Sequence, residues 1–342
     1  MSVPLIQTTP KGLYCEDGNF YVDPWRPVKN AVITHAHSDH ARWGCDRYLA
    51  SEPNRTILPL RLGPNAEIDF MTWGEPRTIG RVKVSFIPAG HILGSAQVVI
   101  ERNGEVAVVS GDYKREKDTT CRAFEPVRCH TFVTESTFGL PIYRWEDPSV
   151  VFEQINSWWR ENQRKGKASL LLSYALGKAQ RLLAGVDSSI GPIYTHGAVE
   201  KLNSAYRNQG VELPSTSYVG ELPKETDFSQ ALIIAPPASA GTSWIRKFGK
   251  VSTAMASGWM QIRGTRRRRS MDRGFVLSDH VDWSSLLRTV EETEAEEVWV
   301  THGYSDVVVR HLRETGVNAK VVETEFTGEL LEGESKDGDS SD

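Results

Sequence analysis

Cysteine is scarce in this sequence. Only four cysteines occur among 342 residues, and none of them forms a CxxC pair. This scarcity argues against both a zinc ribbon and a disulfide framework, so we expect reduced, buried thiols. The four are Cys15, Cys45, Cys121 and Cys129.

Long apolar runs are also missing. No stretch approaches the roughly 20 apolar residues that span a bilayer, and residues 1–4 lack a basic-then-apolar export signal. We therefore expect a cytoplasmic protein that binds no membrane. The hydrophobic share of 39% and the charged share of 25% are ordinary for a soluble globular protein, and the length suggests two domains.

The chain lacks a strong overall charge, since its formal net charge is only −4. This average hides an asymmetry. Residues 239–274 carry nine basic residues and one acid, whereas residues 323–342 carry eight acids and one lysine. The two stretches should therefore face different partners.

Histidine is concentrated at one place. Three of the nine histidines lie within residues 35–40, directly after a short apolar run, and Asp39 lies among them. If the chain stays extended, His35 and His37 point to the same side and could share one metal ion. Asp39 and His40 could reach a neighbouring position, which suggests a second ion. Such ligands suit Zn²⁺, or Mn²⁺ with more oxygen ligands; a loop that merely happens to be rich in histidine is the alternative.

Other candidate ligands follow predicted strands. An alternating strand over residues 81–87 leads to His91, which lies between glycines. A predicted hairpin over residues 97–109 ends shortly before Asp112, where a carboxylate can bridge two metal ions. The next strand delivers Glu135 in the same way. Repeated delivery of polar residues at strand ends is typical of a site built along one edge of a sheet.

Two late histidines repeat this pattern. His280 follows an apolar run at residues 274–277, and His302 follows another at residues 297–300. The first domain should therefore be interrupted by a middle unit and completed by the C-terminal segment. Asp23, at an earlier strand end, is either a carboxylate that orients a ligand histidine or a turn-forming residue before proline.

The middle unit shows a different pattern of predicted elements. Asp147 and Pro148 predict the start of a helix that runs to about Lys165. A buried strand at residues 170–172 then leads to a predicted helix over residues 173–181. Strands and helices continue to alternate, so we expect a compact α/β unit with its own parallel sheet.

Basic residues of this unit are the candidate contacts for a phosphate backbone. Lys178 and Arg181 lie in the first turns of the predicted helix, whose N-terminus would attract phosphate, although ordinary solvated charges are the alternative. A later cluster of arginines fits either a nucleic-acid contact or a solvated loop. The cluster consists of Arg263, Arg266, Arg267, Arg268 and Arg269.

These motifs resemble the metallo-β-lactamase superfamily and, within it, the β-CASP branch of nucleases. The superfamily resemblance is carried by Asp23, His35, His37, Asp39, His40, His91 and Asp112. The branch resemblance is carried by Glu135, the inserted unit and the two late histidines. It implies an α/β fold, namely a metallo-β-lactamase αββα sandwich interrupted by an inserted α/β β-CASP domain. The expected parts are residues 1–145 and 273–331 for the sandwich, 146–272 for the insert, and 332–342 for an acidic disordered tail.

The resemblance also implies a role for each residue. One metal ion would be bound by His35, His37 and His91, and a second by Asp39, His40 and His302, with Asp112 shared. The expected catalytic residues are Asp39, Glu135 and His280, with His280 as the proton donor to the leaving oxygen. Glu135 would support His280 or a ligand, and Asp23 would orient a ligand.

Three loops narrow the resemblance to the bacterial ligase-associated DNA exonucleases: residues 22–27, 94–97 and 135–141. This likeness implies a DNA exonuclease of DNA repair that acts on single-stranded or frayed ends, with two divalent ions, zinc or manganese. An ATP-dependent DNA ligase and a helicase are the implied partners. A histidine at the position of His302 is more typical of RNA-processing members, so a β-CASP ribonuclease is one alternative. A small-molecule metallo-hydrolase is another, but it would leave the insert and the arginine cluster without a purpose.

Overall fold

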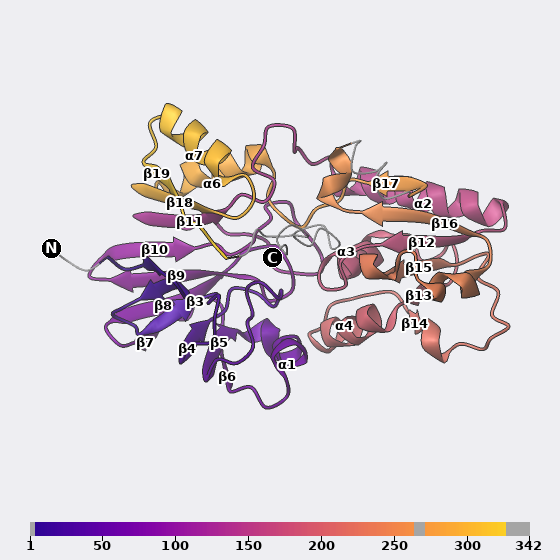
Figure 1. Ribbon diagram of the computed structural model, residues 1–342, viewed down its shortest axis with the longest axis horizontal. Helices are drawn as coiled ribbons and strands as arrows, with labels where there is room; N and C mark the ends of the chain where they lie inside the picture. The colour runs from indigo at the N-terminus through magenta and orange to yellow at the C-terminus, as the bar shows by residue number, and fades with distance from the viewer. Residues whose placement is uncertain (1–3, 263–270, 326–342) are drawn as a thin grey trace, which may run out of the picture. The chain divides into compact units, whose positions relative to one another are not determined.

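The computed structural model describes residues 4–262 and 271–325, which form a mixed α/β structure with three sheets (Figure 1). The chain divides into two compact units. Among the described residues, unit 1 comprises 4–144, 205–212 and 279–325, and unit 2 comprises 145–204, 213–262 and 271–278. The α/β class expected from the sequence is confirmed. All four cysteines are free thiols, and two of them, Cys15 and Cys129, are buried.

Unit 1 is built on two sheets that share one apolar core. In sheet order, the first consists of β1 (Gln7–Thr9), β2 (Gly12–Cys15), β3 (Phe20–Val22), β4 (Asn30–Val32), β5 (Arg47–Ser51) and β6 (Ile68–Met71). The second consists of β19 (Ala319–Val321), β18 (Glu297–Thr301), β11 (Thr131–Glu135), β10 (Glu105–Val109), β9 (Ala96–Arg102), β8 (Val82–Pro88) and β7 (Arg77–Ile79). Alternate residues of β8, such as Val84 and Phe86, are buried and belong to the same core cluster as Phe20 and Val22 of β3. The core therefore lies between the two sheets.

Two helices cover the other face of the second sheet. They are α6 (Trp283–Thr293) and α7 (Ser305–Glu314), seen beside β18 and β19 in Figure 1. Leu286 of α6 and Leu312 of α7 cluster with Phe132 of β11 and Val298 of β18. The short helices η1 (Glu52–Thr56) and α1 (Leu58–Leu62) follow β5.

The predicted hairpin is confirmed. β9 and β10 pair antiparallel, and the turn between them contains Asn103 at φ 51° and Gly104 at φ 86°. Two successive residues with positive φ match the twist of the flanking strands, and for this reason Asn-Gly is favoured there.

Unit 2 contains a sheet whose strands all run parallel, as expected. In sheet order the strands are β14 (Ser217–Tyr218), β13 (Ile193–Thr195), β15 (Leu232–Ala235), β12 (Ala168–Leu172), β16 (Val251–Ala256) and β17 (Arg273–Phe275). Its helices are α2 (Pro148–Arg164), α3 (Lys178–Gly185) and α4 (Gly197–Asn208), of which α4 belongs to unit 2 only as far as Ser204. The short turns are η2 (Val219–Glu221), η3 (Pro237–Ser239), η4 (Ser243–Phe248) and η5 (Gly258–Gln261).

The two helix starts predicted in unit 2 have different outcomes. Asp147 caps α2 as expected, because its Oδ1 accepts a hydrogen bond of 2.9 Å from the Ser149 amide. The helix predicted over residues 173–181 starts too early, because α3 begins only at Lys178. Gly177 takes a φ of 88°, which is not helical, and the Gln180 side chain accepts from its amide at 2.8 Å. This glycine therefore marks the true start of α3.

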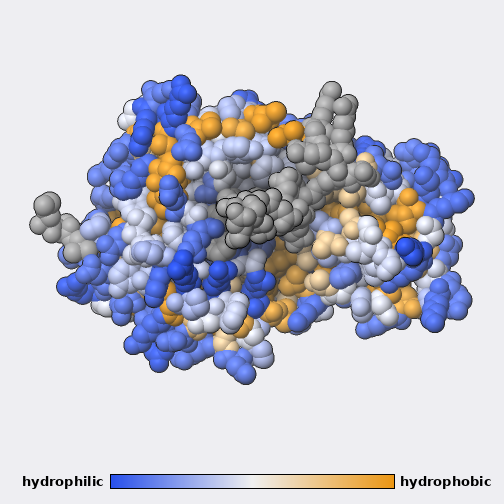
Figure 2. All heavy atoms as spheres, viewed as in Figure 1, coloured by the Kyte–Doolittle hydropathy of each residue, from blue (hydrophilic) through white to orange (hydrophobic). Residues whose placement is uncertain are grey.

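The visible surface is mostly hydrophilic (Figure 2). Within the described part of the chain, no helix combines the length and apolarity that crossing a membrane requires.

The ends of β11 and β18 meet closely, and this contact can be tested. Gly303 has a φ of 65°, and a Cβ at this position would collide with the Ser136 carbonyl oxygen, whereas Gly316, at φ 90°, has open space around it. We expect Gly303→Ala to lower the free energy of unfolding by about 2–5 kcal/mol, because strain and overpacking add. Gly316→Ala should lower it by only about 1 kcal/mol. Urea unfolding of both variants makes the comparison, and equal losses would contradict the close approach.

Candidate metal centre

The candidate ligands gather where strands of unit 1 end. β10, β11 and β18 are parallel neighbours, so their carboxyl ends lie at one edge of the second sheet. The residues at or just after strand ends around this edge include His35, His91, Asp112, Glu135 and His302. Most of their side chains are buried, which keeps water from competing for them.

Asp112 lies at the centre of this group. Its Oδ2 is 3.4 Å from His40 Nε2, 3.5 Å from His35 Nε2 and 3.9 Å from His91 Nε2. Burial opposes ionisation of this carboxyl, but the charges of His40 and His280 outweigh it and hold the pKa of Asp112 well below its usual range. Asp112 is therefore a carboxylate with several imidazoles aimed at one of its oxygens.

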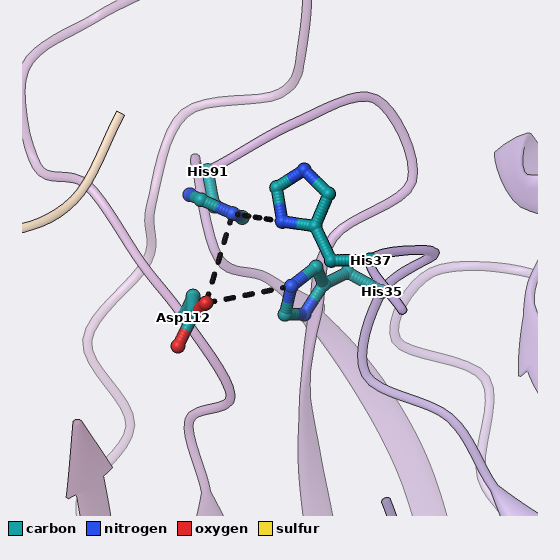
Figure 3. Close-up of side chains that lie close together, drawn as sticks. All are labelled: His35, His37, His91 and Asp112. Atoms are coloured by element: carbon teal, nitrogen blue, oxygen red, sulfur yellow. Dashed lines mark hydrogen bonds and ion pairs between the residues drawn. The ribbon is translucent and has the colours of Figure 1, made fainter. Parts of the chain in front are cut away.

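One set of four side chains has the spacing of a metal site. His35, His37, His91 and Asp112 each offer a ligand atom, and these atoms all lie within 4.8 Å of one another (Figure 3). His91 Nε2 and His37 Nδ1 are 3.1 Å apart. Imidazole nitrogens and a carboxylate oxygen are the donors that zinc prefers in catalytic sites.

His35 is held in one tautomer by the residue before it. The Thr34 hydroxyl donates to Asp23 Oδ2 at 2.5 Å, so its oxygen can accept from His35 Nδ1 at 3.0 Å. Nε2 then carries the lone pair that a metal ion needs. This atom is buried and has no hydrogen-bond partner among the described residues. An unpaired buried nitrogen is unfavourable, so an ion at this position would satisfy it.

Asp23 holds His40 in the same way. Its Oδ2 accepts from His40 Nδ1 at 2.7 Å, while its Oδ1 accepts from the Thr34 amide at 2.8 Å. These hydrogen bonds are the geometry that an orienting carboxylate requires, and the role itself stays a prediction. His40 Nε2 is likewise buried, and it lies 3.4 Å from Asp112 Oδ2.

His91 and His302 are also oriented through Nδ1. His91 Nδ1 donates to the Asp279 carbonyl oxygen at 2.7 Å. The Thr301 hydroxyl donates to the Thr134 carbonyl oxygen at 3.2 Å, and its oxygen lies 3.0 Å from His302 Nδ1. In both His35 and His302, the hydroxyl oxygen of the preceding threonine lies 3.0 Å from Nδ1 and can accept its proton.

The protonation of three of these imidazoles, those of His35, His91 and His302, favours metal binding. Burial lowers the pKa of His35 and of His91 well below the usual value, and burial also lowers that of His302. These rings are therefore neutral near pH 7 and need not lose a proton to bind an ion. For His40, burial acts in the same direction, but the carboxylates of Asp112, Asp39 and Asp23 raise its pKa well above the usual value.

The second expected ligand set is more open. Asp39, His40 and His302 line a cavity of about 30 Å³ together with Asp23. The cavity exceeds the roughly 10–15 Å³ that one water molecule needs. Asp39 Oδ2 lies 3.9 Å from His40 Nε2, and the rings of His40 and His302 have centroids 5.4 Å apart. The three side chains are brought together, but less tightly than the first set.

His280 and Glu135 form a buried pair beside the cluster. His280 Nδ1 lies 2.9 Å from one Glu135 carboxyl oxygen and 3.0 Å from the other. The Tyr113 amide donates to the same carboxyl group at 2.9 Å. Burial raises the pKa of Glu135, and the neighbouring His280 opposes that rise. His280 also has the spacing of a possible ligand, either with Asp112 and Glu135 or with His91 and Asp279.

The expected nucleic-acid contacts are not all at the surface. Lys178 and Arg181 are buried, at 0% and 4% exposure, so they are not solvated charges. Lys178 Nζ lies 4.7 Å from the centre of the Tyr174 ring, and Arg181 Nη1 donates to the Ser278 carbonyl oxygen at 2.7 Å. Neither side chain is therefore exposed for a direct contact with phosphate, and this prediction is wrong for both residues. The arginine cluster lies outside the described residues: Arg263, Arg266, Arg267, Arg268 and Arg269.

Sequence reasoning missed Thr34, Thr301 and the Asp279 carbonyl, which fix histidine tautomers. A repeated signal was present, because Thr-His follows a strand both at Thr34 and at Thr301. The contact from Asp279 joins residues 188 positions apart and leaves no such local signal.

Comparisons with known proteins give relatives at low identity. No protein-family model matches the chain. A protein of Opitutus terrae named "Probable DNA ligase" is 29% identical over 313 residues, which cover 90% of this chain and 30% of the relative. "Endoribonuclease ysh1" of Aspergillus fumigatus is 26% identical over 74% of this chain and 28% of the relative. "Cleavage and polyadenylation specificity factor 73" of Drosophila melanogaster is 28% identical over 48% of this chain and 25% of the relative.

The chain thus spans less than a third of the length of these relatives. Among solved structures, a protein of unknown function from Enterococcus faecalis has a TM-score of 0.59 at 13% identity, over 86% of this chain and 79% of that one. At this identity the likeness concerns the fold alone.

The role of Asp23 can be tested through metal affinity. Asp23→Asn keeps the shape but weakens acceptance from both Thr34 and His40, so we expect Zn²⁺ affinity to fall roughly 10- to 100-fold. Competition with a chromophoric chelator measures this affinity. Asp46→Asn, at an exposed aspartate of the same unit, is the matched control and should bind Zn²⁺ as the unchanged chain does. Equal affinities in the two variants would show that Asp23 does not orient the ligands.

Proposed function

We propose that this chain is a metal-dependent nuclease that hydrolyses phosphodiester bonds of DNA, acting as an exonuclease in DNA repair. One observation carries the proposal. The buried Asp112 carboxylate has the Nε2 atoms of His35, His40 and His91 within 3.9 Å, and the His280–Glu135 pair lies beside it.

The donor set fits two divalent ions, zinc or manganese. We propose His35, His37 and His91 for one ion, Asp39, His40 and His302 for the other, and Asp112 as the shared ligand. The Nε2 atom of His35, which is buried and has no hydrogen-bond partner among the described residues, supports this assignment. Divalent ions bound by such ligands polarise phosphoryl oxygens and lower the pKa of a bound water to near neutrality.

His280 is the proposed proton donor. Glu135 accepts the Nδ1 proton, which fixes the ring and leaves Nε2 as the other proton-carrying position. A carboxylate in this place also stabilises the charged imidazolium, as in other histidine–carboxylate pairs. The imidazole can then give a proton to the oxygen that leaves phosphorus, because its ordinary pKa lies near neutrality. The Tyr113 amide keeps the Glu135 carboxyl group in place.

We further propose that the fold is a metallo-β-lactamase αββα sandwich with an inserted β-CASP domain. The two face-to-face sheets of unit 1, the helices on the second sheet and the all-parallel sheet of unit 2 support this arrangement. Relatives named as endoribonucleases support the same nuclease branch at low identity.

A DNA substrate and a ligase partner are supported by one relative. The protein named "Probable DNA ligase" matches 90% of this chain with only 30% of its own length. A ligase-named protein thus contains a segment like this chain beside other segments. We propose that this chain works with an ATP-dependent DNA ligase and, in repair, with a helicase.

An RNA substrate is the second candidate. Several relatives carry the name of an endoribonuclease. His302 lines a cavity with Asp39 and His40, and the sequence resemblance implies that a histidine at this position is more typical of RNA-processing members. The metal ligands would be the same for either substrate, so only a comparison of the two nucleic acids separates them.

The substrate can be assigned with end-labelled single strands of DNA and RNA of one sequence. The protein is stripped of metal, and Mn²⁺ or Zn²⁺ is then added back. We expect stepwise shortening of DNA that depends on the added ion, and the labelled end lost first gives the polarity, for which we expect 5′ to 3′. Preferential cleavage of RNA would instead favour the ribonuclease, and no cleavage of either strand would refute the proposal.

The role of His280 can be separated from that of the ligands. We expect His280→Ala to reduce cleavage by about 10²- to 10⁴-fold, because a proton donor is removed, while the bound metal stays unchanged. Metal content by mass spectrometry and cleavage rate are measured on the same sample. His130→Ala, at an exposed histidine of the same unit, serves as the control. Loss of metal from His280→Ala would identify His280 as a ligand.

A further inference from the structure

Trp43 differs from every other tryptophan in the chain. All ten tryptophans lie among the described residues, and Trp43 alone is exposed. Its side chain has 74% of its surface in solvent, the largest value among the large hydrophobic residues that are exposed. Tryptophan is highly buried on average in folded proteins, so such exposure calls for a reason.

The turn that carries Trp43 is well supported. The buried Tyr48 hydroxyl donates to the Arg42 carbonyl oxygen at 2.8 Å and accepts from the Cys45 amide at 2.9 Å. Burial raises the pKa of Tyr48 to about 12, so the hydroxyl keeps its proton under ordinary conditions. The two bonds close the chain around Trp43 and Gly44. The indole is therefore presented to solvent by a fixed turn.

Trp43 lies close to the metal centre. It follows His40 by three residues, so the two Cα atoms are at most about 11 Å apart. A strand whose phosphodiester bond lies at the ligands would therefore bring a neighbouring base within reach of the indole.

The surroundings of Trp43 fit a nucleic acid better than a protein partner. Of its neighbours in the chain, Gly44, Asp46 and Arg47 are exposed and none carries a large apolar side chain, so the turn itself forms no extended apolar patch. A protein interface would need a larger apolar area around its anchor. Arg42 precedes Trp43 directly, and the exposed Arg47 follows four residues later. An aromatic residue flanked by basic residues is the pattern of single-strand binding sites.

We propose that Trp43 is a stacking platform for an unpaired nucleobase of the strand that is cleaved. This inference rests on the proposed nuclease function and assigns a residue to the single-stranded or frayed ends that the sequence resemblance implies. A base within a duplex already has a neighbour on each face, so only an unstacked base can lie against the indole. The strand must therefore be single or frayed next to the cleaved bond.

A base-deletion experiment tests this inference. Single-stranded DNA and RNA oligonucleotides are prepared intact and with one abasic nucleotide moved through each position. Binding is measured by fluorescence anisotropy and cleavage by KM and kcat, for the unchanged chain, Trp43→Ala and Trp43→Phe. Val307→Ala, at an exposed apolar residue of α7, is the surface control.

We expect Trp43→Ala to weaken binding and raise KM for intact oligonucleotides by about 5- to 150-fold, as removal of a stacking aromatic does. Trp43→Phe should restore most of the loss. One abasic position should weaken binding by the unchanged chain but add nothing in Trp43→Ala, because the same stack is already lost. Metal content should be equal in all variants.

Two outcomes separate this inference from the nuclease proposal. If oligonucleotides are cleaved but Trp43→Ala behaves like Val307→Ala, the stacking role is refuted and the nuclease remains. If no strand is cleaved while binding still depends on Trp43 and on one base, the stacking role stands and the proposed catalysis fails. Absence of both binding and cleavage would overturn both.

Discussion

The structure of unit 1 depends on keeping one carboxylate ionised inside the protein. Asp112 is 5% exposed, and a buried charge is strongly unfavourable unless opposite charge or hydrogen-bond donors surround it. His40 and His280, which come from separate segments of the chain, meet this need, because their charges hold the pKa of Asp112 well below its usual range. The meeting is possible only because parallel strands end at one edge, where their following loops converge. The same electrostatic arrangement that permits burial also collects the donors that a divalent cation would take.

The histidines and carboxylates could be predicted from the sequence because they follow apolar strands one after another. Strand ends at one sheet edge are close in space, so spacing in the chain was enough to anticipate that His91 and Asp112 would meet. The hydrogen bonds that fix the orientation of each imidazole ring were harder to predict. Thr34 and Thr301 look like ordinary strand-end residues until their hydroxyl partners are known. The number of ions and the boundaries of the domains stay predictions.

Errors arose where tertiary packing overrode local pattern. Lys178 and Arg181 look like surface charges at a helix start, yet both are buried, and Arg181 binds a carbonyl oxygen 97 residues away. The helix itself starts late because Gly177 takes a positive φ and Gln180 caps it. A sequence pattern gives the period of an element, but it carries little information about which charges the rest of the chain will cover.

The order of the ligands along the chain has a consequence for biosynthesis. His35, His91 and Asp112 are made early, whereas His280 and His302 come only after all of unit 2. At about 5–20 residues per second, a ribosome needs roughly 10–40 s to pass from Asp112 to His302. A chain that has not yet reached His280 therefore holds most of the candidate donors but lacks the two late histidines. Such an order would delay any hydrolytic activity until unit 2 has been synthesised.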